Sequence, residues 1–354
     1  MSTPFKPTAI KDPDSDEQKQ GCVAAIKAIQ PPMPMLQQPL PEQPSVSVLI
    51  CSYNRLPFLV TLLMQLASQT YEKYEVIVLG ELDVSFSLQP PAVGIQFFPS
   101  PTKHLGVMRN LAVLLAKGEF LIFIDDDFYI TEDFITRHVL LNIQEQGRGA
   151  AAVQGHFIGA PYDERGNGWV RRACTFQPNG SHLKILRMGN CFIKRAALES
   201  VGGFNMSLRF GEEDTELGQR LHALGHVILN APEVVSIHLG AATGGTRTEP
   251  GEMPRRLAGK IADGGLSRVS LNQPVMGALY ICKHLFKNMV HNPSLFLGNF
   301  PTLWKESVVY FCQQVRQNLG LARQKHMALT KDQYLHSSEF QKDRDEKSVA
   351  FHLM

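Results

Sequence analysis

A run of large apolar residues that ends abruptly in three aspartates constrains the fold of this chain more than any other feature. Residues 120–129 read Phe-Leu-Ile-Phe-Ile-Asp-Asp-Asp-Phe-Tyr. Such a run, with polar residues on either side, is typical of a fully buried strand. In open α/β sheets ligands bind outside the carboxyl ends of the strands, so we expect Asp125, Asp126 and Asp127 to face a ligand.

Two interpretations of the three aspartates are open. Adjacent carboxylates repel one another, and a divalent cation among them removes that repulsion. Oxygen ligands of this kind suit Mg²⁺ or Mn²⁺, especially when a bound diphosphate supplies further oxygens. Alternatively, the aspartates form a solvated acidic turn before a helix that starts near Thr131.

The composition is that of a globular protein: among 354 residues, 44% are hydrophobic and 19% are charged. The net charge of +2 argues against a general nucleic-acid binder. The six cysteines form no CxxC pair, which fits a reducing compartment. The first residues lack the apolar region of a signal peptide, and no apolar run has transmembrane length. We therefore expect a cytoplasmic protein.

Composition also divides the chain. Residues 1–43 are rich in Pro, Gln, Lys and Asp, so we expect a disordered arm that buries little surface. Residues 44–250 are expected to form the main α/β domain, 251–325 a helical extension and 326–354 a polar tail.

Strands and helices alternate through the main domain. Apolar patterns predict strands over 46–51, 74–79, 94–98 and the run at 120, with helices over 57–67 and 107–116. This alternation predicts a largely parallel sheet with right-handed crossovers, flanked by helices. The second half is less regular, with strands expected over 150–154, 186–193, 226–229 and 234–239, a loop over 161–181 and a helix over 214–224.

Two features near the strand ends fit a nucleotide site. Ser52, Tyr53, Asn54 and Arg55 directly follow the first predicted strand, where a nucleotide would meet backbone amides and a helix N-terminus. Arg109 stands near the start of the helix over 107–116 and could face a diphosphate. Taken alone, the first is a simple strand-to-helix turn and the second a helix-surface arginine.

Two further features lie in the second half. Glu212, Glu213, Asp214 and Glu216 crowd the start of the predicted helix over 214–224. The helix dipole explains one or two carboxylates there, but not readily four within five positions. His238 ends an apolar strand before a glycine-rich loop over 240–245; a lone histidine in such a place is more often structural than a ligand.

Taken together, these residues resemble the family 2 glycosyltransferases, an inverting group with the GT-A fold. The resemblance runs from Val46 to His238 and keeps the family's order along the chain. Its elements are the opening VSVLICSYNR, Arg109-Asn110 as the Ala-Arg-Asn element with Met108 in place of alanine, Asp125-Asp126-Asp127 as the DxD element, the segment 188–204, and Glu213-Asp214 at the family's ED position.

The resemblance implies a role for each matching position. Asp125 would contact the ribose or base, with Asp126 beside it in the donor site, and Asp127 would hold the Mn²⁺ or Mg²⁺ ion between the phosphates. Asp214 would be the general base, with Glu213 as its rival. A single displacement then gives a β-linkage from an α-linked donor. By the same resemblance, His238 would complete the metal shell and Arg247 would close over the diphosphate.

One element departs from the family's pattern. An acidic pair usually follows the second strand, whereas this chain has Gly80 and Glu81. Glu81 could recognise the base. The chain also lacks the QxxRW element and the membrane helices of processive synthases, so addition of a single sugar is favoured over polymerisation.

The partners implied are a nucleotide-diphospho-sugar donor and a glycan or lipid-linked acceptor, in polysaccharide or surface-glycan synthesis. Residues 277–321 mix aromatic, aliphatic and basic side chains at helical spacing, which suits a helix lying on the cytoplasmic membrane face. The favoured alternative is an amphipathic helix packed on the catalytic domain or on a second subunit, as in a homodimer.

Two other classes of protein are open. A nucleotidyltransferase would also use paired carboxylates on an α/β sheet, but it would normally show a glycine-rich basic loop after the first strand. Residues 52–55 contain no glycine. A non-catalytic nucleotide-sugar-binding protein would be favoured if Asp125, Asp127 or Asp214 were dispensable.

Overall fold

The protein is described by a computed structural model. The described residues are 16–30, 43–53, 55–81, 94–100, 102–144, 150–159, 182–206, 208, 211–239, 258–259, 261–262, 264–265, 274–291, 301–312 and 315. The loops predicted over 161–181 and 240–245 and the tail predicted over 326–354 lie outside these residues.

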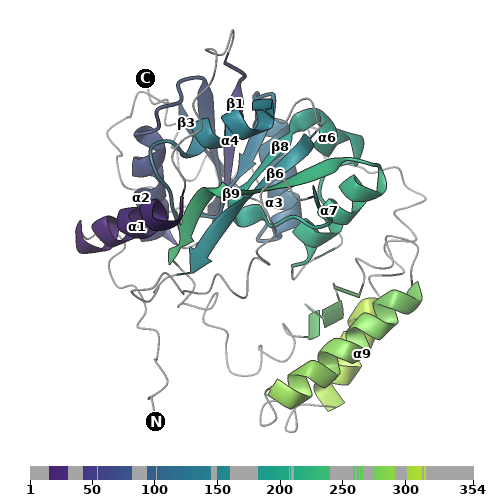
Figure 1. The fold of residues 1–354 in the computed structure, drawn as a ribbon. Helices are drawn as coiled ribbons and strands as arrows, with labels where there is room; N and C mark the ends of the chain where they lie inside the picture. The colour runs from purple at the N-terminus through teal and green to yellow at the C-terminus, as the bar shows by residue number, and fades with distance from the viewer. Residues whose placement is uncertain are drawn as a thin grey trace.

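Within the described ranges, a nine-stranded mixed sheet forms the centre of the molecule (Figure 1). Its strand order is β3-β2-β1-β4-β8-β6-β9-β5, and β7 pairs with β9. The strands are β1 (Val46–Tyr53), β2 (Tyr74–Glu81), β3 (Ile95–Pro99), β4 (Phe120–Phe123), β5 (Phe128–Tyr129), β6 (Ala150–Gly159), β7 (His182–Leu183), β8 (Cys191–Lys194) and β9 (Val227–His238).

The sheet is parallel in its first half and mixed in its second. The pairs β1–β2, β2–β3 and β1–β4 are all parallel, as the alternation of strands and helices predicts. Strand β8 runs antiparallel to both β4 and β6, whereas β6 and β9 are parallel. The prediction of a mainly parallel α/β sheet is therefore confirmed.

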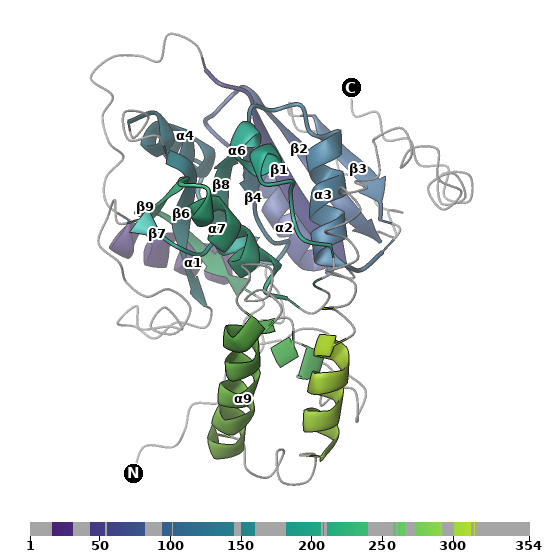
Figure 2. The same cartoon turned by 90° about the vertical axis from the view of Figure 1, so that its right-hand side faces the viewer.

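Helices cover both faces of the sheet, as a three-layer α/β domain requires (Figure 2). One hydrophobic core lies between the sheet and helices α2 and α4, and the other between the sheet and α3, α6 and α7. The helices include α1 (Asp16–Ile29), α2 (Leu56–Ala67), α3 (Leu105–Leu115), α4 (Phe134–Gln144), the 3-10 turn η2 (Met188–Asn190), α6 (Arg195–Ser200), α7 (Glu213–Ala223) and α9 (Pro274–His291), and a further helix spans residues 301–312.

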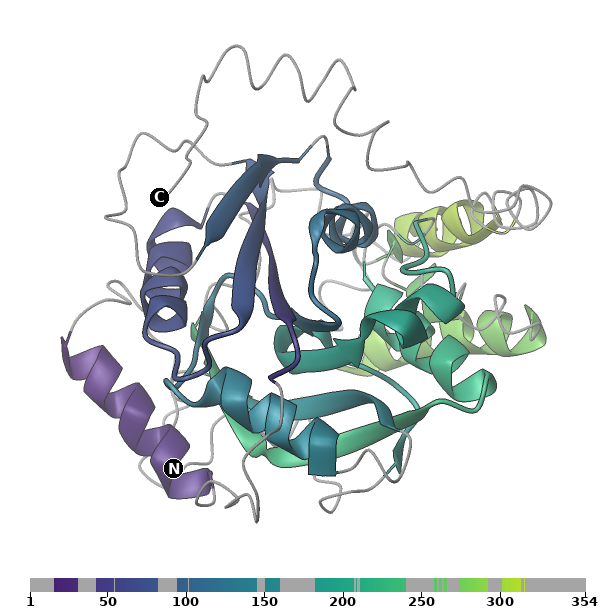
Figure 3. The ribbon, with the colours of Figure 1, turned by 90° about the horizontal axis from the view of Figure 1, so that it is seen from above.

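Helix α1 falls within the region predicted to be a disordered arm, so that prediction is wrong for this segment. Cys22 and Ile26 are fully buried and pack against Tyr129, Val235 and Ile237. Figure 3 shows the helix lying along the outside of the sheet, and its contacts are with β9. Cys22 and Ile26 are four positions apart, so they lie on one face of the helix. Their neighbours are mostly polar or charged, and composition alone does not reveal such a short apolar stripe.

Two strand predictions in the second half need correction. The strand predicted over 186–193 is η2 followed by the shorter β8. The two strands predicted over 226–229 and 234–239 are one strand, β9, which continues past Pro232. Its register with β6 shifts there, from Gly155↔Ala231 to His156↔Val235. Such a bulge accommodates a proline without ending the strand.

A buried polar network ties α4 to the middle of the sheet. His138 Nε2 lies 2.8 Å from Asn190 Oδ1, and the Asn190 amide donates to the carbonyls of His156 and Val234. Burial lowers the pKa of His138 to about 4. The neutral imidazole is therefore part of the folded structure.

We expect the His138 network to make stability fall with acidification. Because the folded pKa lies below the ordinary value of 6.5, the unfolded chain binds more protons between pH 6.5 and 4. The stabilisation is present above pH 6.5, and about 3 kcal/mol of it is lost by pH 4. Urea unfolding at both pH values measures this loss. In His138→Gln, most of this pH-dependent loss of stability should disappear. A variant that loses as much stability as the wild type between pH 6.5 and 4 would contradict the assignment of the effect to His138.

Candidate active site

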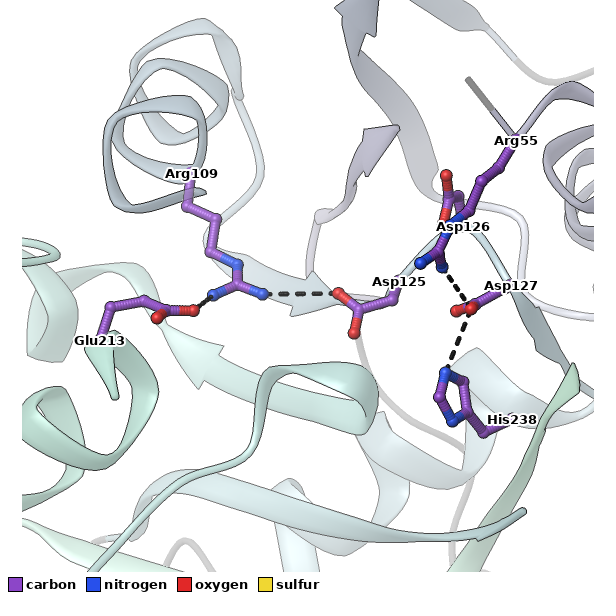
Figure 4. A network of polar contacts seen from close by, with 7 residues as sticks. All are labelled: Arg55, Arg109, Asp125, Asp126, Asp127, Glu213 and His238. Carbon is purple, nitrogen blue, oxygen red and sulfur yellow. Dashed lines mark hydrogen bonds and ion pairs between the residues drawn. The ribbon is translucent and has the colours of Figure 1, made fainter. Parts of the chain in front are cut away.

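The predicted site residues gather at one edge of the sheet, where the parallel strands β1, β2 and β4 end. Strand β1 ends at Tyr53 beside Glu81 of β2, and the three aspartates follow β4. The start of α7 and the last residue of β9 reach the same edge, as Figure 4 shows. This is where open α/β sheets bind ligands.

The middle aspartate, Asp126, is held against the end of β1. Its side chain is only 5% exposed. The Ser52 hydroxyl donates to Asp126 Oδ2 at 2.7 Å, and Arg55 Nη1 lies 3.4 Å from Asp126 Oδ1. Burial, followed by the charge of Asp127, raises the pKa of Asp126 to about 7. Asp126 therefore links the acidic turn to the segment that leads into α2.

Asp127 lies between two cationic side chains. Its Oδ2 accepts a hydrogen bond from Arg55 and lies 3.1 Å from His238 Nε2 (Figure 4). Burial alone would raise the pKa of Asp127, but the hydrogen bond with His238 and the charges of His238 and Arg55 lower it. The same contact raises the pKa of His238 against the effect of its burial. The arrangement favours the ionised form of both groups.

The pairing of β5 with β9 brings His238 to Asp127 across 111 positions of sequence. Phe128, the residue after Asp127, is directly opposite His238, and their rings stack with centroids 4.9 Å apart. The Leu239 amide donates to the Asp127 carbonyl at 2.8 Å. The pairing of β5 with β9 therefore fixes the positions of both Asp127 and His238.

The remaining oxygen of Asp127 bears on metal binding. Asp127 Oδ1 is buried and accepts no hydrogen bond within the described part of the chain. A buried carboxylate oxygen without a partner is costly unless a cation or ligand satisfies it. No three His, Cys, Asp or Glu side chains of the described ranges form a metal site by themselves. The residues fit Mg²⁺ or Mn²⁺ held by one or two protein ligands and by phosphate oxygens.

Arg109 joins the acidic turn to α7. It donates to Glu213 Oε1 through Nη1, and its Nη2 lies 3.4 Å from Asp125 Oδ1 (Figure 4). The Arg109 and Glu213 side chains are 6% and 7% exposed, so water screens this pair little. Burial would lower the pKa of Arg109, but the two carboxylates raise it, and the guanidinium stays charged. Arg109 is therefore not the helix-surface residue of the alternative interpretation.

A strained turn sets the start of α7. Gly211 and Glu212 have φ angles of 121° and 66°, both in the region that favours glycine. A left-handed glutamate costs roughly 1 kcal/mol or more, and such strain is concentrated at functional sites. Asp214 follows, its Oδ1 accepting from the Thr215 amide at 2.6 Å. Burial, and then the charge of Glu213, raises the pKa of Asp214. A raised pKa is the adjustment that a general base needs.

The close approach of β1 and β2 explains why a glycine stands at position 80, where the resembling family usually has an acidic residue. A Cβ atom at Gly80 would lie 2.0 Å from the Ser52 carbonyl oxygen, so only glycine fits beside β1. The Glu81 backbone pairs with Tyr53. Lys103 lies over the Tyr53 ring with Nζ 4.0 Å from the centroid, a cation–π contact. Sequence reasoning missed Lys103, although it stands between a strand and Gly106 at the start of α3.

Asn110, the second residue of the Arg109-Asn110 element, has a structural role. Its Oδ1 accepts from the Phe204 amide at 2.8 Å, and its Nδ2 donates to the Phe204 carbonyl at 2.9 Å. These bonds fasten the loop after α6 to α3. Arg109 therefore contributes to the charged site, whereas the adjacent Asn110 holds the loop that leads towards α7.

The structure brings most of the predicted residues into two charged groups. In the first group, Arg55 and His238 contact Asp127, and Asp126 and Ser52 lie beside them. In the second group, Arg109 joins Asp125 to Glu213, and Asp214 follows on α7. Asn54 and Arg247 lie outside the described residues. The metal and catalytic roles of these residues remain predictions.

Comparisons with known proteins agree with this fold. Residues 47–202 match the family model described as Glycosyl transferase family 2. Over 205 residues the chain is 26% identical to the succinoglycan biosynthesis protein ExoM of Rhizobium meliloti (strain 1021), covering 53% of this chain and 64% of ExoM. Over 99 residues it is 31% identical to EpsH of Bacillus subtilis (strain 168), covering 26% of this chain and 29% of EpsH.

A solved structure has the same fold. S. aureus TarS 1-349, in complex with UDP-GlcNAc, superimposes with a TM-score of 0.52 at 18% identity, covering 77% of this chain and 81% of that one. Sheet, flanking helices and acidic strand end together define a GT-A fold. Residues 47–202, less than half of the chain, therefore resemble the glycosyltransferases of family 2. It spans less than two thirds of the length of the curated relatives ExoM and EpsH.

Within the described residues, no helix is both long enough and apolar enough to cross a membrane.

Proposed function

We propose that this protein is an inverting, metal-dependent glycosyltransferase that moves a sugar from a nucleotide-diphosphate donor to an acceptor hydroxyl. The observation that carries the proposal is the buried, unpartnered Oδ1 of Asp127 at the carboxyl end of β4, among the described residues. A carboxylate held there by Arg55 and His238 has one oxygen left for a ligand. The proposed catalytic domain spans residues 44–250.

The donor would lie across the ends of β1, β2 and β4. Asp127 and His238 would hold Mn²⁺ or Mg²⁺, and His238 would give up its ring proton when the metal binds. The bound ion would neutralise charge on the diphosphate as the sugar leaves. Arg55 carries a further positive charge at the same place and would bind phosphate oxygens. Tyr53 offers a ring for the base, and Asp125, the most exposed of the three aspartates at 41%, would bind ribose or base.

Asp214 would be the general base. Glu213 is already engaged by the buried Arg109, whereas Asp214 makes its described hydrogen bonds only with the adjacent Thr215. Asp214 would take the proton of the acceptor hydroxyl while the oxygen attacks the anomeric carbon. The bond from that carbon to the diphosphate breaks in the same step, and the configuration inverts. This assignment makes Glu213 a positioning residue.

The acceptor is proposed to be a glycan or a lipid-linked glycan. ExoM is named for succinoglycan biosynthesis, and the TarS structure contains UDP-GlcNAc. These relatives favour polysaccharide synthesis and a uridine-type donor for the first experiments.

Thermal unfolding against a panel of nucleotide sugars, with Mn²⁺ and with EDTA, tests the proposal. At about a hundred times its Kd, the correct donor should stabilise the fold by about 2.7 kcal/mol and raise Tm by about 5 to 10 °C. The shift should need the metal. The matching nucleoside monophosphate is the control, because it lacks the second phosphate.

The same panel separates the competing classes. A nucleotidyltransferase should be stabilised by a nucleoside triphosphate more than by any nucleotide sugar. A non-catalytic binding protein should show the metal-dependent shift but release no nucleoside diphosphate with any acceptor. Stabilisation that is equal in Mn²⁺ and in EDTA would argue against the proposed metal site.

A further inference from the structure

The exposed apolar side chains of the protein are concentrated on two helices after the catalytic domain. Ten large apolar residues of the described ranges are exposed, and six of these belong to α9 or to the helix 301–312. They are Leu279 (56%), Phe286 (63%), Val290 (58%), Trp304 (45%), Val308 (37%) and Val309 (43%). The other four exposed apolar residues, on the proposed catalytic domain, are single and scattered, which is normal for a protein surface.

The two helices already have a separate hydrophobic core of their own. Ile281 and Leu285 of α9 are buried with Leu303 and with Ala258 and Ile261. Figure 2 shows the helices side by side, and we call the pair the helical hairpin. The six exposed apolar residues lie outside this internal core, and we call them the apolar surface of the hairpin.

The exposed apolar residues of α9 form a stripe along the helix. Leu279, Phe286 and Val290 are separated by seven and four residues, which places them on one face of a helix. Ile281 and Leu285 lie on the opposite face. The stripe holds a phenylalanine and two aliphatic residues, each more than half exposed.

The charged residues beside the apolar surface are almost all basic. Lys283 and Lys287 are exposed next to the stripe of α9, and Lys305 is exposed next to Trp304. Residues 274–291 contain no Asp or Glu, and Glu306 is the only acidic residue of 301–312. Lysines beside aromatic and aliphatic residues match a surface that is negative outside and apolar beneath.

We propose that the helical hairpin binds the surface of an anionic lipid membrane, with its exposed apolar residues in the interfacial layer and its lysines at the lipid headgroups. Neither described helix has the character of a membrane span, so the contact would be interfacial. A symmetric dimer through this surface is less suitable, because it would bring Lys283 and Lys287 of one copy near those of the other.

This surface would hold the catalytic domain close to the membrane, which suits a lipid-linked acceptor. The membrane contact does not depend on the proposed transferase activity. Its test is therefore made on the full chain without donor, and its failure would leave the function of the site untouched.

Trp304 provides an internal probe of membrane contact. The chain has two tryptophans, Trp169 and Trp304. In a Trp169→Phe background, we expect vesicles of phosphatidylglycerol and phosphatidylcholine to shift Trp304 emission to shorter wavelength. Brominated acyl chains should quench this emission. Vesicles of phosphatidylcholine alone should bind much less, and salt should weaken binding to the anionic vesicles.

Matched variants separate the apolar and basic contributions. Phe286→Glu should lower the vesicle partition coefficient about tenfold or more. Leu224→Glu, which alters an equally exposed side chain (63%) at the end of α7, should leave it unchanged. Each of Lys283→Gln, Lys287→Gln and Lys305→Gln should lower partitioning to anionic vesicles about fivefold.

Three outcomes would overturn the proposal. They are Trp304 emission unaffected by vesicles, equal partitioning of the Phe286→Glu and Leu224→Glu variants, and self-association without lipid that Phe286→Glu abolishes. The last would assign the surface to a second copy of the chain. Circular dichroism of each variant at matched concentration confirms that the helices remain folded.

Discussion

Asp214→Asn is expected to abolish sugar transfer while donor affinity stays unchanged. The amide cannot accept the acceptor's proton, but its Oδ1 can still accept the hydrogen bond that Asp214 receives from Thr215. General-base catalysis contributes about 10² to 10⁴-fold to rate, so kcat should fall by that factor. Product formation under saturating donor measures kcat, and calorimetric titration of the donor measures affinity.

Glu213→Gln is the matched control for Asp214→Asn, because the two carboxylates are adjacent on α7. Arg109 and Glu213 are both buried, and removing one partner of a buried ion pair costs about 3 kcal/mol or more. Glu213→Gln should therefore lower stability, which Asp214→Asn should not. If Glu213→Gln stopped transfer without loss of stability and Asp214→Asn remained active, the base would be Glu213.

Asp127→Ala is expected to eliminate metal-dependent donor binding. The substitution removes the unpartnered Oδ1 and also the oxygen that meets Arg55 and His238. Changes in the second shell of a metal site already lower metal affinity about 10 to 100-fold, so loss of a direct ligand should exceed about 100-fold. Donor titration with Mn²⁺ and with EDTA should then give the same weak affinity.

Asp126→Asn tests whether the effect is specific to position 127. Asp126 is buried against Ser52, and an asparagine oxygen can still accept that hydroxyl hydrogen bond. This variant should keep its dependence on Mn²⁺. Equal loss in the Asp126 and Asp127 variants would mean that the acidic turn acts only through its total charge.

The sequence contained enough information to predict the first half of the sheet. Strands β1, β2 and β4 are nearly continuous apolar runs, the pattern of parallel strands buried on both faces. The polar residues at the ends of β1 and β4 meet at one edge of the sheet, where Ser52 and Arg55 contact the aspartates. The sequence alone therefore predicts that Asp125, Asp126 and Asp127 lie at the carboxyl end of a central strand.

The contacts within the site were not predictable in the same way. The Asp127–His238 contact depends on the two-residue strand β5, which is too short to give a periodic pattern. The Arg109–Glu213 pair joins residues 104 positions apart and depends on how α3 and α7 lie beside the sheet. Long-range pairing of this kind follows from the assembled fold rather than from local spacing.

The most direct test of the account is nucleoside diphosphate release by the wild-type protein. The measurement uses the stabilising donor and an extracted glycan acceptor, with Mn²⁺ and with EDTA, alongside Asp214→Asn. We expect release of nucleoside diphosphate with Mn²⁺, at least a hundredfold less release with EDTA, and a similar loss in the variant. Release that persists in EDTA and in Asp214→Asn would contradict a metal-dependent transferase with Asp214 as its base.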